Sequence, residues 1–333
     1  MRTAAVIELA PTPRHQFQFA TWLFPSWLLF AWQPGRVTVD LVVFCEHRAC
    51  DSLPTECRAT LTAPSNHSTP RCVSVRMPAP FAAGQYPFAT SVDFLVSPEF
   101  ASLLAYTRPR YDYVLRADAD SVFGPSTAHW LPPKAAAFGK GFMGVNATLN
   151  TLEELSRSYG LRQQHIHGMQ STIYLHRRLV APFATLLVNL TERVYREEFT
   201  PLKCRARLCQ WPEWHRGVSS LYAQDLAVNH FIPAAHAADV VTGRLDYGAT
   251  GLHAEFSQVV MAHLLSVKHL PEFSSAGEVR CKAAAGGRVD AKGSRAKWFD
   301  RSPPMSWPDI VYWLYYMRSR EACAILQKWA PLQ

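Results

Sequence analysis

A nearly continuous run of apolar, mostly β-branched residues, Val37–Phe44 (VTVDLVVF), constrains the fold of this chain most. A strand buried on both faces of a parallel sheet has this composition, whereas a strand with one solvated face alternates polar and apolar residues. We predict that this run is the first strand of a parallel sheet and that Tyr111–Arg116 (YDYVLR) is a second strand. The chain has 333 residues, 48% of them hydrophobic, which is enough for a substantial core. The predicted fold class is α/β, with a mostly parallel central sheet flanked by helices.

The regions on either side of the predicted sheet are assigned to helices. Residues 1–36 are predicted to be a helical lead-in, residues 37–300 the main domain, and residues 301–333 a C-terminal helix that packs on it. The apolar run Phe19–Trp32 is shorter than the about 20 residues that cross a bilayer, and Pro25 interrupts it. We therefore expect a buried helix there, and membrane association would require an anchor that is cryptic or missing from this sequence.

Capping residues, apolar spacing and local composition predict further helices and a loop around these strands. Ser97, followed by a proline, predicts the start of one helix, and Thr151 with Glu154 forms a capping box that predicts the start of another. Apolar residues at helical spacing predict a long amphipathic helix over Leu179–Val194. Glu46–Pro80 is rich in Pro, Cys, Ser and Thr, which is typical of a long loop or a disulfide-pinned excursion.

Asp118 and Asp120 follow the second predicted strand and are the leading candidates for a functional site. Along an extended segment, side chains two residues apart lie on the same side, so both carboxylates can face one ion while Ala119 packs the other way. The carboxyl ends of parallel strands are where open α/β sheets bind ligands, and hard cations such as Mn²⁺ and Mg²⁺ prefer carboxylate and phosphate oxygens. The pattern predicts a metal site that also binds phosphates, with Arg116 adding positive charge. Capping of a strand-end turn by the two Asp side chains is the alternative.

Three stretches around and after this motif carry a resemblance to known enzymes. They are Tyr111–Trp130 (YDYVLRADADSVFGPSTAHW), Gly160–Tyr174 (GLRQQHIHGMQSTIY) and Trp211–His230 (WPEWHRGVSSLYAQDLAVNH). They are similar to a group of algal and protist proteins with the character of GT-A-like nucleotide-diphospho-sugar transferases, and the similarity runs from about Val37 to Phe299. The resemblance implies a Rossmann-like GT-A fold, Mn²⁺ or Mg²⁺ as cofactor, and transfer of a sugar from a nucleotide-sugar donor to a glycan or glycoprotein acceptor.

The resemblance also implies the composition of the metal site. In GT-A enzymes the second Asp of the motif usually contacts the ion, which is Asp120 here, and a later histidine often completes the coordination. The candidates are His263 and His269, in the segment MAHLLSVKH. The pattern of the group has His-x-His near this point, and Leu265 replaces the second histidine. The identity of the third protein ligand is therefore not assigned from the sequence.

An inverting transferase needs a general base near the acceptor hydroxyl. Gly217–Phe231 reads as a helix on which Asp225 shares a stripe with apolar residues. Partial burial raises the pKa of a carboxyl toward values suited to a base, so Asp225 is the first candidate and Glu213 the second. A buried hydrogen bond from the helix to a loop is the alternative role for Asp225, and a retaining enzyme would not need this base.

Three further residues are candidates for contact with a substrate. Trp211 and Trp214 have aromatic faces that suit the C–H side of a sugar ring, and packing in the core is the alternative role. His167, two residues after His165, would face the donor or acceptor if this segment is extended, although an isolated histidine pair is more often structural.

Charge and cysteine content restrict the partners and the compartment. Lys and Arg outnumber Asp and Glu by 34 to 26 without a dense basic block, which suits a small anionic substrate such as a nucleotide diphosphate. No nucleic-acid partner is expected, because no nucleic-acid-binding motif accompanies this charge. Eight cysteines and the N-x-S/T sequons at Asn66, Asn146 and Asn189 favour the lumen of the secretory pathway, with the Golgi as the expected location.

Two other functions remain as alternatives. An apolar strand followed by Asp118-Ala119-Asp120 also fits the nucleophile motif of haloacid-dehalogenase-type phosphatases, in which the first Asp attacks phosphorus. That family has the motif after its first strand and a further acidic pair later, and this sequence has neither feature. A non-catalytic GT-A-like sugar-binding protein is the other alternative, because one histidine of the His-x-His pattern is replaced.

Overall fold

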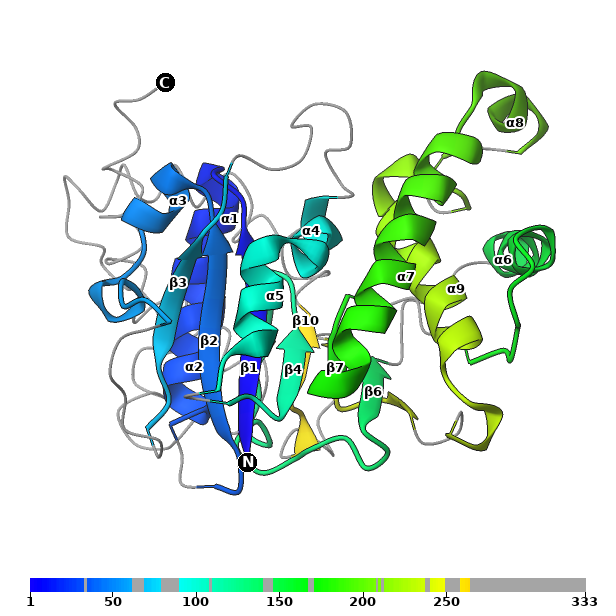
Figure 1. The fold of residues 1–333 in the computed structure, drawn as a ribbon. Coiled ribbons are helices and arrows are strands. Elements are labelled where there is room, and N and C mark those ends of the chain that lie inside the picture. The colour runs from blue at the N-terminus through cyan, green and yellow to red at the C-terminus, as the bar shows by residue number, and fades with distance from the viewer. Residues whose placement is uncertain are drawn as a thin grey trace, which may run out of the picture.

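The computed structural model describes most of the chain from residue 1 to residue 263. The described residues are 1–32, 35–61, 69–78, 90–107, 110–139, 146–166, 171–207, 209–210, 213–236, 240–248 and 258–263. They form a seven-stranded mixed sheet and a three-stranded sheet, with helices on both faces of the larger one (Figure 1). The predicted C-terminal helix over residues 301–333 lies outside the described residues.

The large sheet is parallel except for one strand. Its order is β3 (Cys72–Arg76), β2 (Thr38–Cys45), β1 (Arg2–Leu9), β4 (Tyr113–Arg116), β7 (Ile173–His176), β6 (Ala136–Gly139) and the two-residue β8 (Val241–Thr242). Strand β7 runs antiparallel to both of its neighbours, and the other pairings are parallel. The predicted α/β class with a mostly parallel sheet is confirmed.

The first strand is β1, so the prediction that Val37–Phe44 is the first strand was wrong. β1 pairs with β2 on one side and β4 on the other, in the interior of the sheet. Residues 1–36 therefore contain an interior strand of the sheet in addition to α1 (Pro13–Gln18), η1 (Phe19–Leu23) and α2 (Phe24–Phe30). The apolar run in these helices is largely buried, as predicted. Among the described residues, no helix has the length and apolar character needed to span a bilayer.

Alternating side chains of the central strands fill two cores. On β2, Val42 and Phe44 point to one face of the sheet, and Val43 and Cys45 point to the other. The first face is covered by α5 (Pro98–Ala105), α7 (Arg177–Glu197) and α9 (Ser219–Phe231), and the second by η1 and α2. The predicted amphipathic segment is part of α7, whose apolar stripe is buried in the first core.

The two predicted helix starts have different outcomes. Ser97 caps α5, because its Oγ accepts a hydrogen bond from the backbone N–H of Phe100 at 3.1 Å. The predicted capping box at Thr151 was wrong. Thr151 lies inside α6 (Asn146–Ser158), because the helix begins at Asn146. The remaining helical elements are α3 (His47–Asp51), η2 (Thr55–Cys57), α4 (Thr90–Asp93), η3 (Phe94–Val96), α8 (Pro201–Ala206), η4 (Arg216–Val218) and η5 (Ala234–His236).

Three disulfides join cysteines of the described residues: Cys45–Cys50, Cys57–Cys72 and Cys204–Cys209. The first two attach the segment after β2 to β2 and β3, which confirms the disulfide alternative predicted for Glu46–Pro80. The prediction missed that this segment also contains α3, η2 and the strand β3 of the large sheet. Disulfides persist in oxidising compartments and are rare in the cytosol. The structure thus supports an oxidising compartment of the secretory type.

A buried carboxylate joins four segments at the amino edge of the sheet. Asp40 of β2 is fully buried and accepts two hydrogen bonds from the guanidinium of Arg2 on β1, at 3.0 and 2.8 Å. It also accepts from the backbone N–H of Arg71, before β3, at 2.9 Å and from the hydroxyl of Tyr111, before β4, at 2.8 Å. A buried charge is tolerated when it is paired and hydrogen-bonded in this way. One side chain therefore connects the first four parallel strands.

We predict that Asp40→Asn lowers the free energy of unfolding by about 3–5 kcal/mol, because it leaves the Arg2 charge buried without its partner. Urea unfolding followed by circular dichroism measures this change. The matched control is Glu197→Gln, which breaks an exposed ion pair with Arg193 on α7 and should cost about 0.3–0.5 kcal/mol. Equal losses in the two variants would contradict the role given to Asp40.

Candidate metal centre

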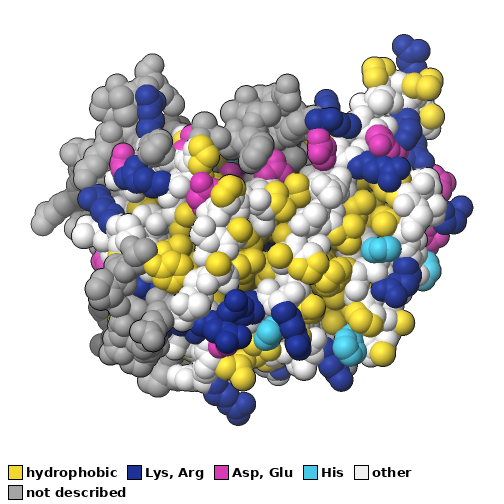
Figure 2. All heavy atoms as spheres, viewed as in Figure 1, with side chains coloured by type: hydrophobic (Ala, Val, Ile, Leu, Met, Phe, Trp, Pro, Cys, Tyr) yellow, Lys and Arg dark blue, Asp and Glu magenta, His cyan; other side chains and the backbone are white. Residues whose placement is uncertain are grey.

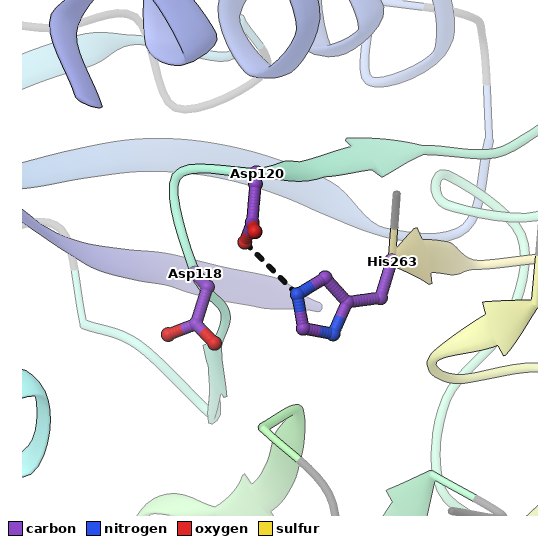
Figure 3. Close-up of side chains that lie close together, drawn as sticks. All are labelled: Asp118, Asp120 and His263. Atoms are coloured by element: carbon purple, nitrogen blue, oxygen red, sulfur yellow. Dashed lines mark hydrogen bonds and ion pairs between the residues drawn. The ribbon is translucent and has the colours of Figure 1, made fainter. Parts of the chain in front are cut away.

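Three side chains from distant parts of the sequence meet at the carboxyl end of β4. Asp118 and Asp120 lie in the turn after β4, and His263 ends the short strand β10 (Met261–His263). One ligand atom from each lies within 4.8 Å of the others, and Nε2 of His263 is 2.9 Å from Oδ1 of Asp120 (Figure 3). The structure thus brings together the predicted carboxylate pair and one of the two candidate histidines. His269 lies outside the described residues.

A small second sheet carries His263 to the two carboxylates. β5 (Ser121–Phe123) follows Asp120 directly and pairs antiparallel with β10, so that His263 lies opposite Ser121. Gly124 permits the close approach of the segment before β10, because a Cβ at this position would lie 2.4 Å from the carbonyl oxygen of Val259. The third strand, β9 (Tyr247–Gly248), pairs parallel with β10 on its other side.

Arg116, at the end of β4, holds Asp118 in place. Its side chain is buried, and Nη2 donates to Oδ1 of Asp118 at 2.6 Å and to the carbonyl oxygen of Ser91 at 2.9 Å. Its Nη1 donates to the carbonyl oxygen of Ser171. Both terminal nitrogens are therefore engaged by the protein, so Arg116 supports Asp118 in this arrangement. The predicted contact of Arg116 with a phosphate stays a prediction.

Asp246 lies behind His263 and was missed in the sequence analysis. Its side chain is 2% exposed, and Oδ1 lies 3.9 Å from Nδ1 of His263. The carboxylate accepts from the backbone N–H of Thr172 at 2.9 Å, from the Thr172 hydroxyl, and from the Ser171 hydroxyl at 3.3 Å. The Ser171 hydroxyl lies within hydrogen-bond distance of Nδ1 of His263, at 3.4 Å, and links this ring nitrogen to Asp246. Histidine ligands of metals usually have such a polar group at the second ring nitrogen, which fixes the orientation of the ring. Asp246 also has a φ of 50°, a conformation that few residues other than glycine adopt.

The carboxylates around His263 favour its charged form. Burial alone would lower the pKa of this imidazole, but Asp120, Asp246 and Asp118 together outweigh burial and raise the pKa of His263 to about 9. In the metal-free protein His263 is therefore protonated at neutral pH and forms an ion pair with Asp120. A metal ion that binds Nε2 must displace this proton.

The donor set and its spacing fit a divalent ion. Two ligand atoms about 2.1 Å from an octahedral ion and at right angles lie about 3.0 Å apart. Nε2 of His263 and Oδ1 of Asp120 are 2.9 Å apart because they share a hydrogen bond, so an ion that replaces this bond could take both atoms with little movement of the side chains. Carboxylates suit both predicted ions, whereas imidazole favours transition metals over Mg²⁺. Of the two, Mn²⁺ matches the mixed set of oxygen and nitrogen ligands better.

Glu8, at the carboxyl end of β1, is a second residue that the sequence analysis missed. Burial raises the pKa of Glu8 to about 8; Arg116 opposes the shift, and Asp93, Glu46 and Asp118 add to it. Burial also raises the pKa of Asp93 to about 6. The carboxyl edge around the metal centre is therefore rich in acidic groups, some of which retain a proton near neutral pH.

The predicted general bases are not part of the group formed by Asp118, Asp120 and His263. Asp225 is 1% exposed on α9, in the helical layer that covers one face of the sheet. Glu213 lies before this helix, and its backbone carbonyl accepts a hydrogen bond from the hydroxyl of Thr148 on α6. Their roles as bases stay predictions.

The predicted sugar-contacting residues are only partly described. Trp214 is 2% exposed, and its ring stacks on Tyr222 with a centroid separation of 4.0 Å and on Phe199 with one of 5.6 Å. The structure therefore gives Trp214 the alternative role, packing in the core. His167 and Trp211 lie outside the described residues.

The family described as a domain of unknown function (DUF7164) matches residues 1–274 of the chain. The matched region contains both sheets and every residue of the candidate metal centre. No curated protein matches the chain in sequence.

We predict that the affinity for Mn²⁺ rises about tenfold for each pH unit between about pH 6 and pH 8, because each bound ion displaces a proton from His263. Isothermal titration calorimetry in two buffers of different ionisation enthalpy measures both the affinity and the number of protons released. His263→Gln should remove this proton release and weaken binding. An affinity for Mn²⁺ that does not change with pH would contradict the assignment of His263 as a ligand.

We predict that Glu8 makes the metal-free protein less stable as the pH rises. Its pKa is about 8 in the folded protein against an ordinary value of 4.5, so the folded state holds a proton that the unfolded state releases. The stabilisation by this bound proton is complete below pH 4.5 and is lost as the pH rises toward 8. Over this range the folding equilibrium constant falls by at most about tenfold per pH unit. Urea unfolding at several pH values should show a flatter dependence for Glu8→Gln than for the wild type. Parallel curves would disprove the shift.

Proposed function

We propose that this chain, which belongs to the DUF7164 family, is a metal-dependent glycosyltransferase that uses a nucleotide-diphosphate sugar as donor and a glycan or glycoprotein as acceptor. The observation that carries the proposal is the convergence of Asp118, Asp120 and His263 at the carboxyl end of β4. Two carboxylates and an imidazole in this position form a ligand set that a divalent ion can share with the phosphates of a nucleotide.

The topology of the sheet supports a nucleotide at this edge. Along the chain, β2 and β3 are added on one side of β1, whereas β4 lies on its other side. The strand order therefore reverses between β1 and β4, and open α/β sheets bind ligands outside the carboxyl ends of strands at such a point. Asp118 and Asp120 follow β4, and Glu8 lies near the end of β1.

The charge of this edge implies that nucleotide binding depends on a metal ion. Figure 2 shows acidic side chains toward the upper edge of the molecule, where the strands shown in Figure 1 end, with Lys and Arg side chains among them and a further group of Lys and Arg side chains at the lower edge. The positive charge of Arg116 is paired with Asp118. The neighbouring groups Glu8 and Asp93 are acids and cannot attract a phosphate. A diphosphate without a cation would be repelled by Asp118 and Asp120.

The protein residues around the centre have supporting roles in this proposal. When bound, the ion supplies positive charge to the diphosphate and to the departing nucleoside diphosphate. Arg116 fixes the orientation of Asp118, and Asp246 faces the second ring nitrogen of His263. Ser171 connects these two supports, since its carbonyl accepts from Arg116 and its hydroxyl donates to Asp246. The ligands are thereby ordered before the ion binds.

The type of fold, the compartment and the general base belong to the same proposal. The fold is GT-A-like, as the resemblance of the sequence implies, and the parallel core with its site after β4 is consistent with this. The enzyme acts in the lumen of the secretory pathway, in the Golgi; the three disulfides are consistent with this compartment. Asp225 and Glu213 stay the candidate general bases for an inverting reaction.

We predict that one nucleotide or nucleotide sugar binds in the presence of Mn²⁺ and that none binds without it. Isothermal titration calorimetry with a panel of nucleoside diphosphates and nucleotide sugars, with and without Mn²⁺, measures this. Asp120→Asn should weaken metal-dependent binding by more than about a hundredfold, since the loss of outer partners alone costs about 10- to 100-fold.

Glu197→Gln, an exposed change on α7, is the control and should bind as the wild type does. Folding of each variant is checked by circular dichroism. If the folded wild-type protein binds no nucleotide at any metal concentration, the transferase proposal fails. Release of phosphate from a phosphomonoester would then favour the phosphatase alternative, and sugar binding without a nucleotide would favour the non-catalytic one.

A further inference from the structure

An open cavity of about 410 Å³ lies beside the edge strand β3. It is lined by Cys50 and Asp51 from α3, by Arg58 and Thr60 after η2, and by Ser74 and Arg76 of β3. The metal centre follows β4, which is three strands away from β3, or about 14 Å across the sheet. The cavity is therefore separate from the metal centre.

Two disulfides fix the walls of this cavity. Cys45–Cys50 joins the end of β2 to α3, and Cys57–Cys72 joins η2 to the start of β3. The backbone N–H of Ser74 also donates to the carbonyl oxygen of Ala59 at 3.0 Å. The backbone segments that carry the lining side chains are thus held in place before any ligand arrives, which reduces the conformational entropy lost on binding.

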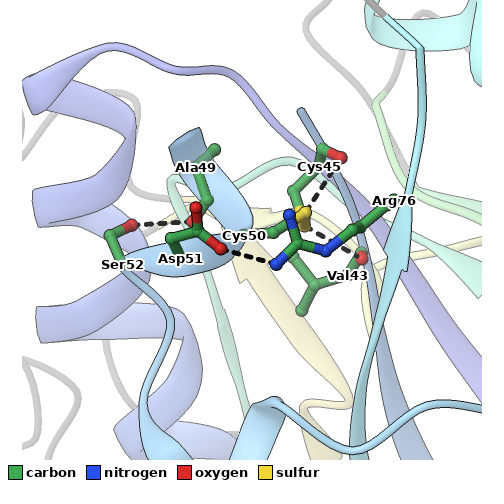
Figure 4. Close-up of a disulfide and its surroundings, with 7 residues drawn as sticks. All are labelled: Val43, Cys45, Ala49, Cys50, Asp51, Ser52 and Arg76. Carbon is green, nitrogen blue, oxygen red and sulfur yellow. Dashed lines mark hydrogen bonds and ion pairs between the residues drawn. A yellow bond between two sulfur atoms is a disulfide. The ribbon is translucent and has the colours of Figure 1, made fainter. Parts of the chain in front are cut away.

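Two guanidinium groups and one carboxylate set the charge of the lining. Nη2 of Arg76 is 2.5 Å from Oδ1 of Asp51, beside the Cys45–Cys50 disulfide (Figure 4). Arg58 donates from Nε to the carbonyl oxygen of Leu53 at 3.2 Å and from Nη2 to that of Asp51 at 3.4 Å. These contacts anchor Arg58, whose Nη1 has no hydrogen-bond partner among the residues that the structure describes.

We propose that this cavity binds a carboxylate group, supplied by a small organic acid or by an acidic sugar. Nη1 of Arg58 and the hydroxyl of Ser74 are donors in the lining, and a carboxylate accepts from such groups in hydrogen bonds, which are charge-assisted in the case of Arg58. Two arginines and one aspartate leave a net charge of +1. This balances one negative charge, whereas the carboxylate of Asp51 opposes a phosphate dianion.

Calorimetric titration of the full chain, without added metal or nucleotide, tests the site with four probes: glucuronate, acetate, inorganic phosphate and glucose. Glucuronate should bind, the uncharged glucose should not, and phosphate should bind more weakly than glucuronate. Acetate distinguishes the two sources of the carboxylate. Affinity equal to that of glucuronate assigns the site to small acids, and much weaker affinity assigns it to acidic sugars.

Three variants separate recognition from a loss of structure. Arg58→Gln should weaken glucuronate binding by at least about tenfold. Asp51→Asn should strengthen phosphate binding, an effect that a damaged wall would not produce. Arg193→Gln is the control, because Arg193 is a similarly exposed arginine in an ion pair on α7.

The proposal is overturned if the folded wild-type protein binds neither glucuronate nor acetate, or if Arg58→Gln binds both as the wild type does. Because the probes contain no nucleotide and no metal is added, these results are independent of the test of the transferase proposal.

Discussion

The buried carboxylate of Asp40 determines how the first four parallel strands are held together. Its partners come from β1 and from the segments that precede β3 and β4, so separate parts of the chain depend on one charge at the amino edge of the sheet. The backbone ladders and the close-packed apolar cores fix the register of these strands, and the bidentate ion pair of Asp40 with Arg2 adds a directional contact between β1 and β2. The register of β1 with β4 places Arg116, the last residue of β4, opposite Val6, so that the turn with Asp118 and Asp120 lies beside the end of β1.

At the carboxyl edge of the sheet, the charges that need compensation belong to several neighbouring carboxyl groups. Several carboxyls lie close together there, which is unfavourable unless protons or cations compensate their charge. In the metal-free protein the compensation comes from Arg116, from protonated His263 and from the raised pKa of Glu8. A divalent ion can replace the proton of His263, and the same groups that stabilise the metal-free state then hold the ligands in position. Stability and metal binding are therefore linked at this edge.

The sequence predicted the parts of this structure that depend on local signals. Asp118 and Asp120 could be found because an apolar strand and the spacing of two acidic residues lie next to each other. β1 was missed because polar residues on both sides, Arg2 and Thr3 before and Glu8 after, confine its continuous apolar run to Ala4–Ile7, and the partner that makes Arg2 compatible with burial lies on another strand. Asp246 was missed for the same reason, since its contacts are distant in the sequence. His263 was reached as one of two candidates through the resemblance, because nothing local distinguishes the histidine that β10 presents to the carboxylates.

The most direct test of the proposed metal centre is a crystal structure with Mn²⁺ and the nucleotide that binds best, with the ion located by anomalous scattering at the manganese edge. The account predicts one strong peak between the carboxylates of Asp118 and Asp120 and Nε2 of His263, with the diphosphate of the nucleotide on the same ion. A peak elsewhere, or a nucleotide bound while the ion pair between His263 and Asp120 stays intact, would contradict it.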